Sequence, residues 1–162
     1  MHLHLIRTAL ATAALCALLP AAAHDSDGKL GSVHFKVSCN AEAQREFDLA
    51  MAYYHSFAWE QIKAPLERAL AADATCGMTH WASALASLDN PFAWPGNVSA
   101  KTLTEGEALM AQARKAGLAT QRERDYVDAL AAFFKDADKL NHRTRAKALE
   151  SGLERVAANH PD

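Results

Sequence analysis

Histidines and cysteines are the side chains of this 162-residue chain best suited to chemistry. Imidazole and thiolate groups are ligands for zinc and copper. His34, His55 and His80 follow one another along the chain and form the candidate metal set. No H-x3-H pair or carboxylate partner accompanies them, and buried neutral histidines are common in proteins. We therefore predict no metal or cofactor, and keep a copper- or zinc-handling protein as the alternative.

Motifs for covalent or phosphate chemistry are missing from the sequence. It contains no P-loop, no G-x-S-x-G, no H-E-x-x-H and no G-x-G-x-x-G. Ser56 follows His55 directly, but adjacent residues of a helix point apart and do not form a nucleophile pair. The sequence predicts no catalytic centre, with an accessory domain of a larger enzyme as the weaker alternative.

The first 23 residues have the pattern of a secretory signal peptide. A short polar start containing Arg7 precedes an apolar run at 9–19, and small residues lead to a cleavage site after Ala23. The apolar run is too short to span a bilayer, so we expect no membrane insertion. This pattern predicts a periplasmic or secreted protein.

Cleavage after Ala23 would leave two cysteines, Cys39 and Cys76. An even pair in an oxidising compartment favours a disulfide, and a metal or redox pair is more often a close C-x-x-C. In an antiparallel helix hairpin, the start of the first helix lies beside the end of the second, where these cysteines stand. We predict a Cys39–Cys76 disulfide that stabilises the fold by roughly 3–4 kcal/mol.

Charge is nearly balanced, with 17 Lys and Arg against 19 Asp and Glu, and like charges form no block. A nucleic-acid-binding protein carries a basic patch or stripe, as does a protein bound to an anionic membrane surface. We therefore expect neither nucleic acid nor an anionic membrane as a partner.

Apolar residues at three- and four-residue spacing predict helices through most of the mature chain. After a polar tail and extended segment at 24–38, we expect helices at 41–56, 59–72, 76–88, 103–116, from Thr120, and at 142–159. The capping signals are Asn40, Thr102-x-x-Glu105, Thr120-x-x-Glu123 and Asn141. Pro65 is expected to kink or locally open the second helix. The sequence predicts an all-α domain over 39–162, built of about three helix hairpins.

The spacing of a tetratricopeptide repeat occurs twice. Glu46-x2-Leu49-Ala50-x2-Tyr53 fits the first helix of such a repeat, and Tyr126-x2-Ala129-Leu130-x2-Phe133 fits the same frame. Ala74 stands where the repeat has proline. This spacing predicts a short α-solenoid, in which each hairpin buries its apolar face against the next.

Four segments add a more specific pattern of aromatic, histidine and cysteine residues: 30–39, 54–59, 76–81 and 141–146. With these segments the chain resembles a family of exported bacterial tetratricopeptide-repeat proteins. The resemblance implies an amino-terminal fragment or truncated member, because members of this family are longer. It also implies that the last hairpin lacks a capping helix and invites self-association.

A helical repeat binds partners on the surface lined by the first helix of each pair. Phe47, Met51, Tyr54, His55 and Trp81 would lie on that surface or in the core beside it. Aromatic and methionine side chains anchor peptides and partner helices in grooves, although an apolar stripe is core by default. We expect a scaffold for protein–protein interaction that binds a protein or peptide in a concave groove.

Overall fold

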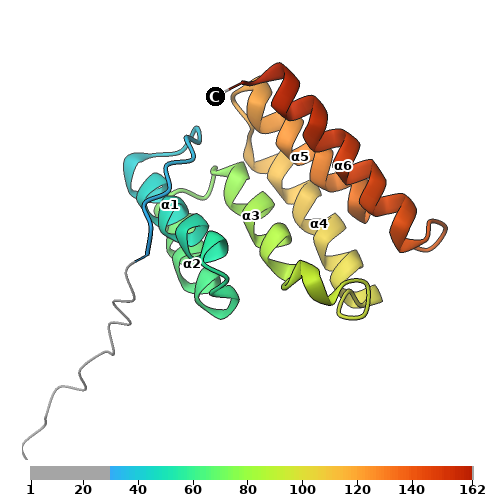
Figure 1. Cartoon of the computed structure of the whole chain (residues 1–162). Coiled ribbons are helices and arrows are strands. Elements are labelled where there is room, and N and C mark those ends of the chain that lie inside the picture. Colours follow the sequence, from blue (N-terminus) through green and yellow to red (C-terminus); the bar gives the residue numbers. More distant parts are fainter. Residues whose placement is uncertain (1–29, 162) are drawn as a thin grey trace, which may run out of the picture.

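Residues 30–161 are described by a computed structural model (Figure 1), and this part of the chain contains helices and no strands. The predicted all-α class is confirmed. The predicted signal peptide and the tail at 24–29 lie outside the described residues. The helices are α1 (Ala41–His55), η1 (Trp59–Ile62), α2 (Lys63–Ala72), α3 (Gly77–Ser87), η2 (Pro91–Ala93), α4 (Ala100–Ala116), α5 (Gln121–Phe134) and α6 (His142–Asn159).

Consecutive helices pack in pairs, α1 with α2, α3 with α4, and α5 with α6. Figure 1 shows the pairs following one another in chain order, with α3 and α4 between the first pair and the last. Short connections between antiparallel helices favour this pairing of chain neighbours. Within residues 30–161, no helix is both long and apolar enough to cross a membrane.

Polar caps fix the starts of three helices where the sequence predicts them. Asn40 accepts hydrogen bonds from the first main-chain N–H groups of α1, and Asn141 does the same for α6. Thr120 and Glu123 form a reciprocal capping box at the start of α5. These side chains satisfy donors that have no partner within the helix.

The predicted start of α4 is wrong, and the helix predicted at 59–72 is divided in two. The start of α4 is set by Ser99, which accepts from the N–H of Thr102, so the helix begins before the predicted capping box. The helix predicted at 59–72 is interrupted two residues before Pro65: residues 59–62 form a 3-10 helix, and α2 begins at Lys63. Pro65 therefore lies in the first turn of α2, where its missing N–H costs no helical hydrogen bond.

Small residues allow the later helices to approach closely. A Cβ atom on Gly106 of α4 would lie 2.1 Å from the ring of Phe134 on α5. A Cβ atom on Gly152 of α6 would lie 2.7 Å from the Cβ of Ala129 on α5. The core between them is closed by side chains that are essentially without exposure, among them Phe133, Phe134, Met110 and Val127.

Polar residues cover most of the outer surface of α6. Its exposed positions include Arg143, Lys147, Glu150 and Arg155, and its large exposed apolar side chain is Leu153, at 41%. A polar outer face is what a terminal helix needs to end a stack of helices. Self-association through this end of the molecule stays a prediction, and the apolar surface available for it on α6 is small.

Candidate functional site in the cavity beside residues 30–38

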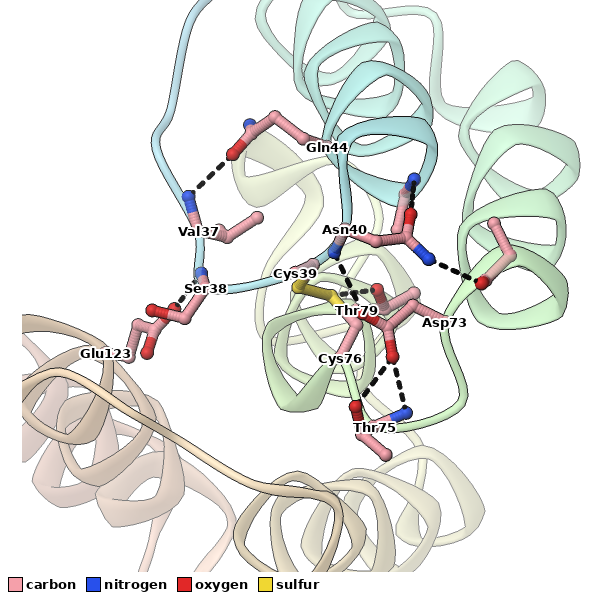
Figure 2. Close-up of a disulfide and its surroundings, with 12 residues drawn as sticks. Val37, Ser38, Cys39, Asn40, Gln44, Asp73, Thr75, Cys76, Thr79 and Glu123 are labelled. Atoms are coloured by element: carbon pink, nitrogen blue, oxygen red, sulfur yellow. Dashed lines mark hydrogen bonds between the residues drawn. A yellow bond between two sulfur atoms is a disulfide. The ribbon is translucent and has the colours of Figure 1, made fainter.

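Residues 30–38, termed the strap, run alongside α1 without forming a helix or strand. Two side chains of α1 bind its main chain. The N–H of Phe35 donates to Asp48 Oδ1 at 3.1 Å, and Gln44 Nε2 donates to the carbonyl of Phe35 at 2.9 Å. The N–H of Val37 donates to Gln44 Oε1 at 2.8 Å, a contact shown in Figure 2. One edge of the strap is therefore bonded to α1.

The other edge of the strap is bonded to the start of α5. The N–H of Ser38 donates to Glu123 Oε1, and Arg122 Nη1 donates to the carbonyl of Lys36 at 3.3 Å. Glu123 is 3% exposed, and its second oxygen caps α5 by accepting from the N–H of Thr120. Main-chain groups of successive strap residues thus face opposite sides, as in an extended chain.

The ring of Phe35 anchors the strap in a cluster of aromatic side chains. Its centroid lies 5.7 Å from that of Phe47, 5.8 Å from that of Trp81 and 5.0 Å from that of Tyr126. The guanidinium of Arg122 covers this ring, with its Cζ atom 4.3 Å from the centroid. Ring packing at these distances and a cation over a ring face are both favourable. The strap therefore links α1, α3 and α5.

A disulfide fixes the end of the strap. Cys39 is bonded to Cys76, with Cα atoms 5.1 Å apart, and Cys76 is the N-cap residue directly before α3 (Figure 2). The bond therefore joins the first helix pair to the second. Beside it, Asp73 accepts hydrogen bonds from the Thr75 hydroxyl and from the N–H groups of Asn40 and Thr75. These bonds lower the pKa of the Asp73 carboxyl.

Next to the strap lies a cavity of about 480 Å³, termed the strap cavity, which is in the size range of ligand pockets. One wall is the strap itself, at Val33, His34 and Phe35. The opposite wall comes from the last helix pair, with Leu149 and Leu153 on α6. Residues far apart in the sequence are therefore brought to one site.

Four of the five residues predicted for the groove line this cavity. Met51, Tyr54 and His55 reach it from α1, and Trp81 reaches it from α3. Phe47 does not: it is fully buried in the core beneath Phe35, because it lies one turn nearer the start of α1. Whether these residues bind a partner stays a prediction.

Sequence reasoning missed the contribution of α5 and α6 to the cavity. Tyr126 and Leu130 line it from α5, and Leu149 and Leu153 line it from α6. Each pair is spaced by four residues, which places both members on one face of a helix. That spacing is a usable signal, but it is also the spacing of an ordinary core stripe.

Burial affects the hydroxyl of Tyr54, one of the polar groups that α1 places at the cavity. Loss of contact with water raises its pKa, because the ionised form is disfavoured where solvation is poor. The hydroxyl therefore stays protonated at neutral pH and can donate a hydrogen bond. With Trp81 and Tyr126, whose rings are 5.6 Å apart, it gives the cavity an aromatic wall with a polar donor.

The three histidines considered for metal do not come together. His34 and His55 border the strap cavity, whereas His80 is not among its lining residues. The ring of His34 is paired with Asp48 Oδ2 at 2.9 Å, and burial lowers the pKa of His80. Across residues 30–161, no three His, Cys, Asp or Glu side chains are grouped so as to hold a metal ion.

Comparison of the whole chain with protein-family models, with curated proteins and with solved structures gives no match in any of the three. The strap cavity is therefore the feature of the molecule that bears on its function. Its features are an apolar and aromatic lining, a protonated tyrosine, and a neighbouring extended segment bound through its main chain.

Proposed function

We propose that this protein is a scaffold for protein–protein interaction that binds an extended part of its partner in the strap cavity. In this proposal the three helix pairs form a short tetratricopeptide-like solenoid, and the protein is exported to the periplasm or secreted. The protein has no catalytic centre in this proposal. The role of the helices is to hold side chains of α1, α3, α5 and α6 around one groove.

The strap is the observation that carries this proposal. Gln44 and Asp48 bind its main chain, and an aromatic cluster takes the ring of Phe35. These are the interactions by which a groove binds a peptide, with main-chain hydrogen bonds for affinity and side-chain pockets for specificity. The strap cavity adjoins these contacts at Val33, and Tyr54 and Leu85 are also among the residues that line it.

Selection of peptides tests the proposal. A random nonapeptide library displayed on phage is panned on the full protein, and the affinity of selected peptides is measured by fluorescence anisotropy. Leu153→Arg places a charge on the rim of the strap cavity, where the leucine is 41% exposed. We expect this variant to bind selected peptides at least about tenfold more weakly, because an anchoring apolar contact is lost.

Leu140→Arg is the matched control, because Leu140 is 39% exposed and lies outside the cavity. This variant should bind within about twofold of the wild type, as expected for a surface change away from the site. Failure to select any peptide contradicts the proposal. Equal weakening by the two arginine variants contradicts it as well, because binding would then not depend on the cavity.

A further inference from the structure

The two ends of the strap differ in how their main chain is bonded. Across residues 30–161, hydrogen bonds engage the main chain of the strap from Phe35 to Ser38, and none engages that of Val33 or His34. Both of these residues line the strap cavity. The strap therefore presents unused main-chain groups where the cavity begins.

Main-chain hydrogen bonds along the strap alternate between α1 and α5, and this alternation indicates which way the N–H and carbonyl of His34 point. Phe35 and Val37 bond to α1, whereas Lys36 and Ser38 bond to α5. In an extended chain, residues two apart share an edge. The N–H and carbonyl of His34 therefore belong to the edge on the α5 side.

The hydrogen bonds that α5 makes to that edge reach Lys36 and Ser38 and do not extend to His34. The strap-binding residues Arg122 and Glu123 lie at the start of α5, and one to two turns later the cavity is lined by Tyr126 and Leu130. Leu130 has no polar group, and among residues 30–161 neither Tyr126 nor Arg122 makes a hydrogen bond to the main chain of His34, so partners for this edge come from water or from an incoming chain.

We propose that an extended segment of a partner protein enters the strap cavity and adds to the strap as a strand, pairing its main chain with that of His34. Strand addition obtains affinity from main-chain hydrogen bonds and specificity from pockets for alternate side chains. In this arrangement an apolar side chain of the segment lies against Leu130 and Leu149. The inference rests on the proposed function and specifies how the partner binds.

The lining also limits the side chains that the segment can carry. It consists of apolar, aromatic and histidine residues with Arg122, and it contains no carboxylate. A lysine or arginine facing the cavity would lose solvation without gaining a partner of opposite charge. Cavity-facing residues of the partner segment are therefore large and apolar, at alternate positions, and not basic.

A proline at position 34 tests the pairing, because proline has no N–H to donate. The probe is a nonapeptide selected on the wild-type protein. His34→Pro should bind it about tenfold more weakly or worse, the loss expected for a main-chain hydrogen bond within a paired segment. His34→Ala is the matched control: it removes the side chain, 73% exposed, and its contact with Asp48, but keeps the N–H. His34→Pro should bind the peptide at least about tenfold more weakly than His34→Ala, because both variants lose the imidazole and the proline variant also loses the main-chain N–H.

A second measurement covers the case in which His34→Pro displaces the strap, which near-ultraviolet circular dichroism of the ring cluster around Trp81 would report. The selected peptide is then N-methylated at one position at a time and tested on the wild-type protein. Binding should be lost at alternate positions, because only alternate N–H groups of an added strand face the strap.

Three results would overturn strand addition and leave the proposed function standing. The first is full binding by His34→Pro together with loss of binding by Leu153→Arg. The second is equal loss in His34→Pro and His34→Ala. The third is a selected set that carries lysine or arginine at contact positions, or apolar residues at helical spacing. Failure to select peptides at all would instead remove the proposed function and this inference together.

Discussion

The junction between the first and second helix pairs is held differently from the junction between the second and third. At the second junction, the ring of Phe134 on α5 lies against Gly106 on α4, at a distance that leaves no space for a Cβ atom. At the first junction, a cavity of about 370 Å³ separates parts of α2 and α3, lined by residues such as Leu66 and Ala86. The first junction is linked instead by a disulfide and by the strap, whose Phe35 ring lies 5.8 Å from the ring of Trp81 on α3.

The difference between the two junctions shows how a small helical protein can keep a cavity between its helices. Close packing fills the space between helices, so a junction built only that way offers little room for a ligand. A disulfide and main-chain hydrogen bonds hold the first helix pair in place, so side chains need not fill the space between it and the rest of the molecule. The strap cavity lies where α1, α3 and α5 are held apart in this way.

The largest expected effect comes from breaking the packed junction. Phe134→Ala should lower the free energy of unfolding by about 3–5 kcal/mol, because a fully buried ring is replaced by a cavity. Urea unfolding followed by circular dichroism measures it. Phe92→Ala, at a residue that is 83% exposed, should change stability by less than about 0.5 kcal/mol. A small loss in Phe134→Ala would mean that packing does not hold this junction.

Removal of the covalent link tests the other junction. The double variant Cys39→Ala with Cys76→Ala should lose roughly 3–4 kcal/mol, because the unfolded chain is no longer restrained by a bond spanning 37 residues. Reduction of the wild-type protein should lower its free energy of unfolding, measured in urea, by a similar amount. Unchanged stability in both experiments would contradict the assignment of this junction to the disulfide.

The strap is also bonded to the third helix pair, through the buried carboxylate of Glu123, which accepts hydrogen bonds from Ser38 of the strap and from Thr120 at the start of α5. Glu123→Gln should cost about 2 kcal/mol, because an amide replaces one of two charge-assisted acceptors with a donor. Glu154→Gln, on the exposed surface of α6, is the control and should be neutral within about 0.5 kcal/mol. Equal stability of the two variants in urea would show that the bond between the strap and α5 does not stabilise the fold.

The smallest expected effect is at Asp73, beside the disulfide. Asp73→Ala should cost about 1 kcal/mol at pH 7 through loss of its hydrogen bonds to Asn40 and Thr75. The pKa of this carboxyl is lowered in the folded protein. Its stabilisation is therefore full above the ordinary carboxyl pKa of about 3.9 and disappears as the pH falls through the folded-state pKa.

Urea unfolding of wild-type and Asp73→Ala proteins at a series of pH values measures this contribution. The difference between the two should shrink toward zero in strong acid, while Asp138→Ala, at an exposed carboxyl, should follow the wild type throughout. A difference that stays constant down to pH ~2 would exclude the hydrogen-bonded carboxylate as its source.

Helix positions were predictable because their signals are local. Asn40, Asn141 and the Thr120–Glu123 box mark helix starts through neighbouring N–H groups, and apolar spacing marks the buried faces. The predicted cysteine pair also occurs in the structure, although it joins the first pair of helices to the second.

The strap cavity was only partly predictable because it depends on distant contacts. Ser38 meets Glu123 across 85 residues of sequence, and no local pattern encodes that contact. The sequence also did not indicate which buried side chains border the cavity. Phe47 and Met51 lie on one face of the same helix, but only Met51 lines the cavity. Periodicity identifies a stripe as buried, but the neighbouring helices decide which of its members border an open space.

The most direct test of the account is a crystal structure of the full protein bound to a selected nonapeptide. We predict an extended peptide between the strap at Val33–His34 and the α6 residues Leu149 and Leu153, with its main chain paired to His34. A peptide seated elsewhere, for example in the cavity between α2 and α3, would contradict the central claim that the strap cavity is the binding site.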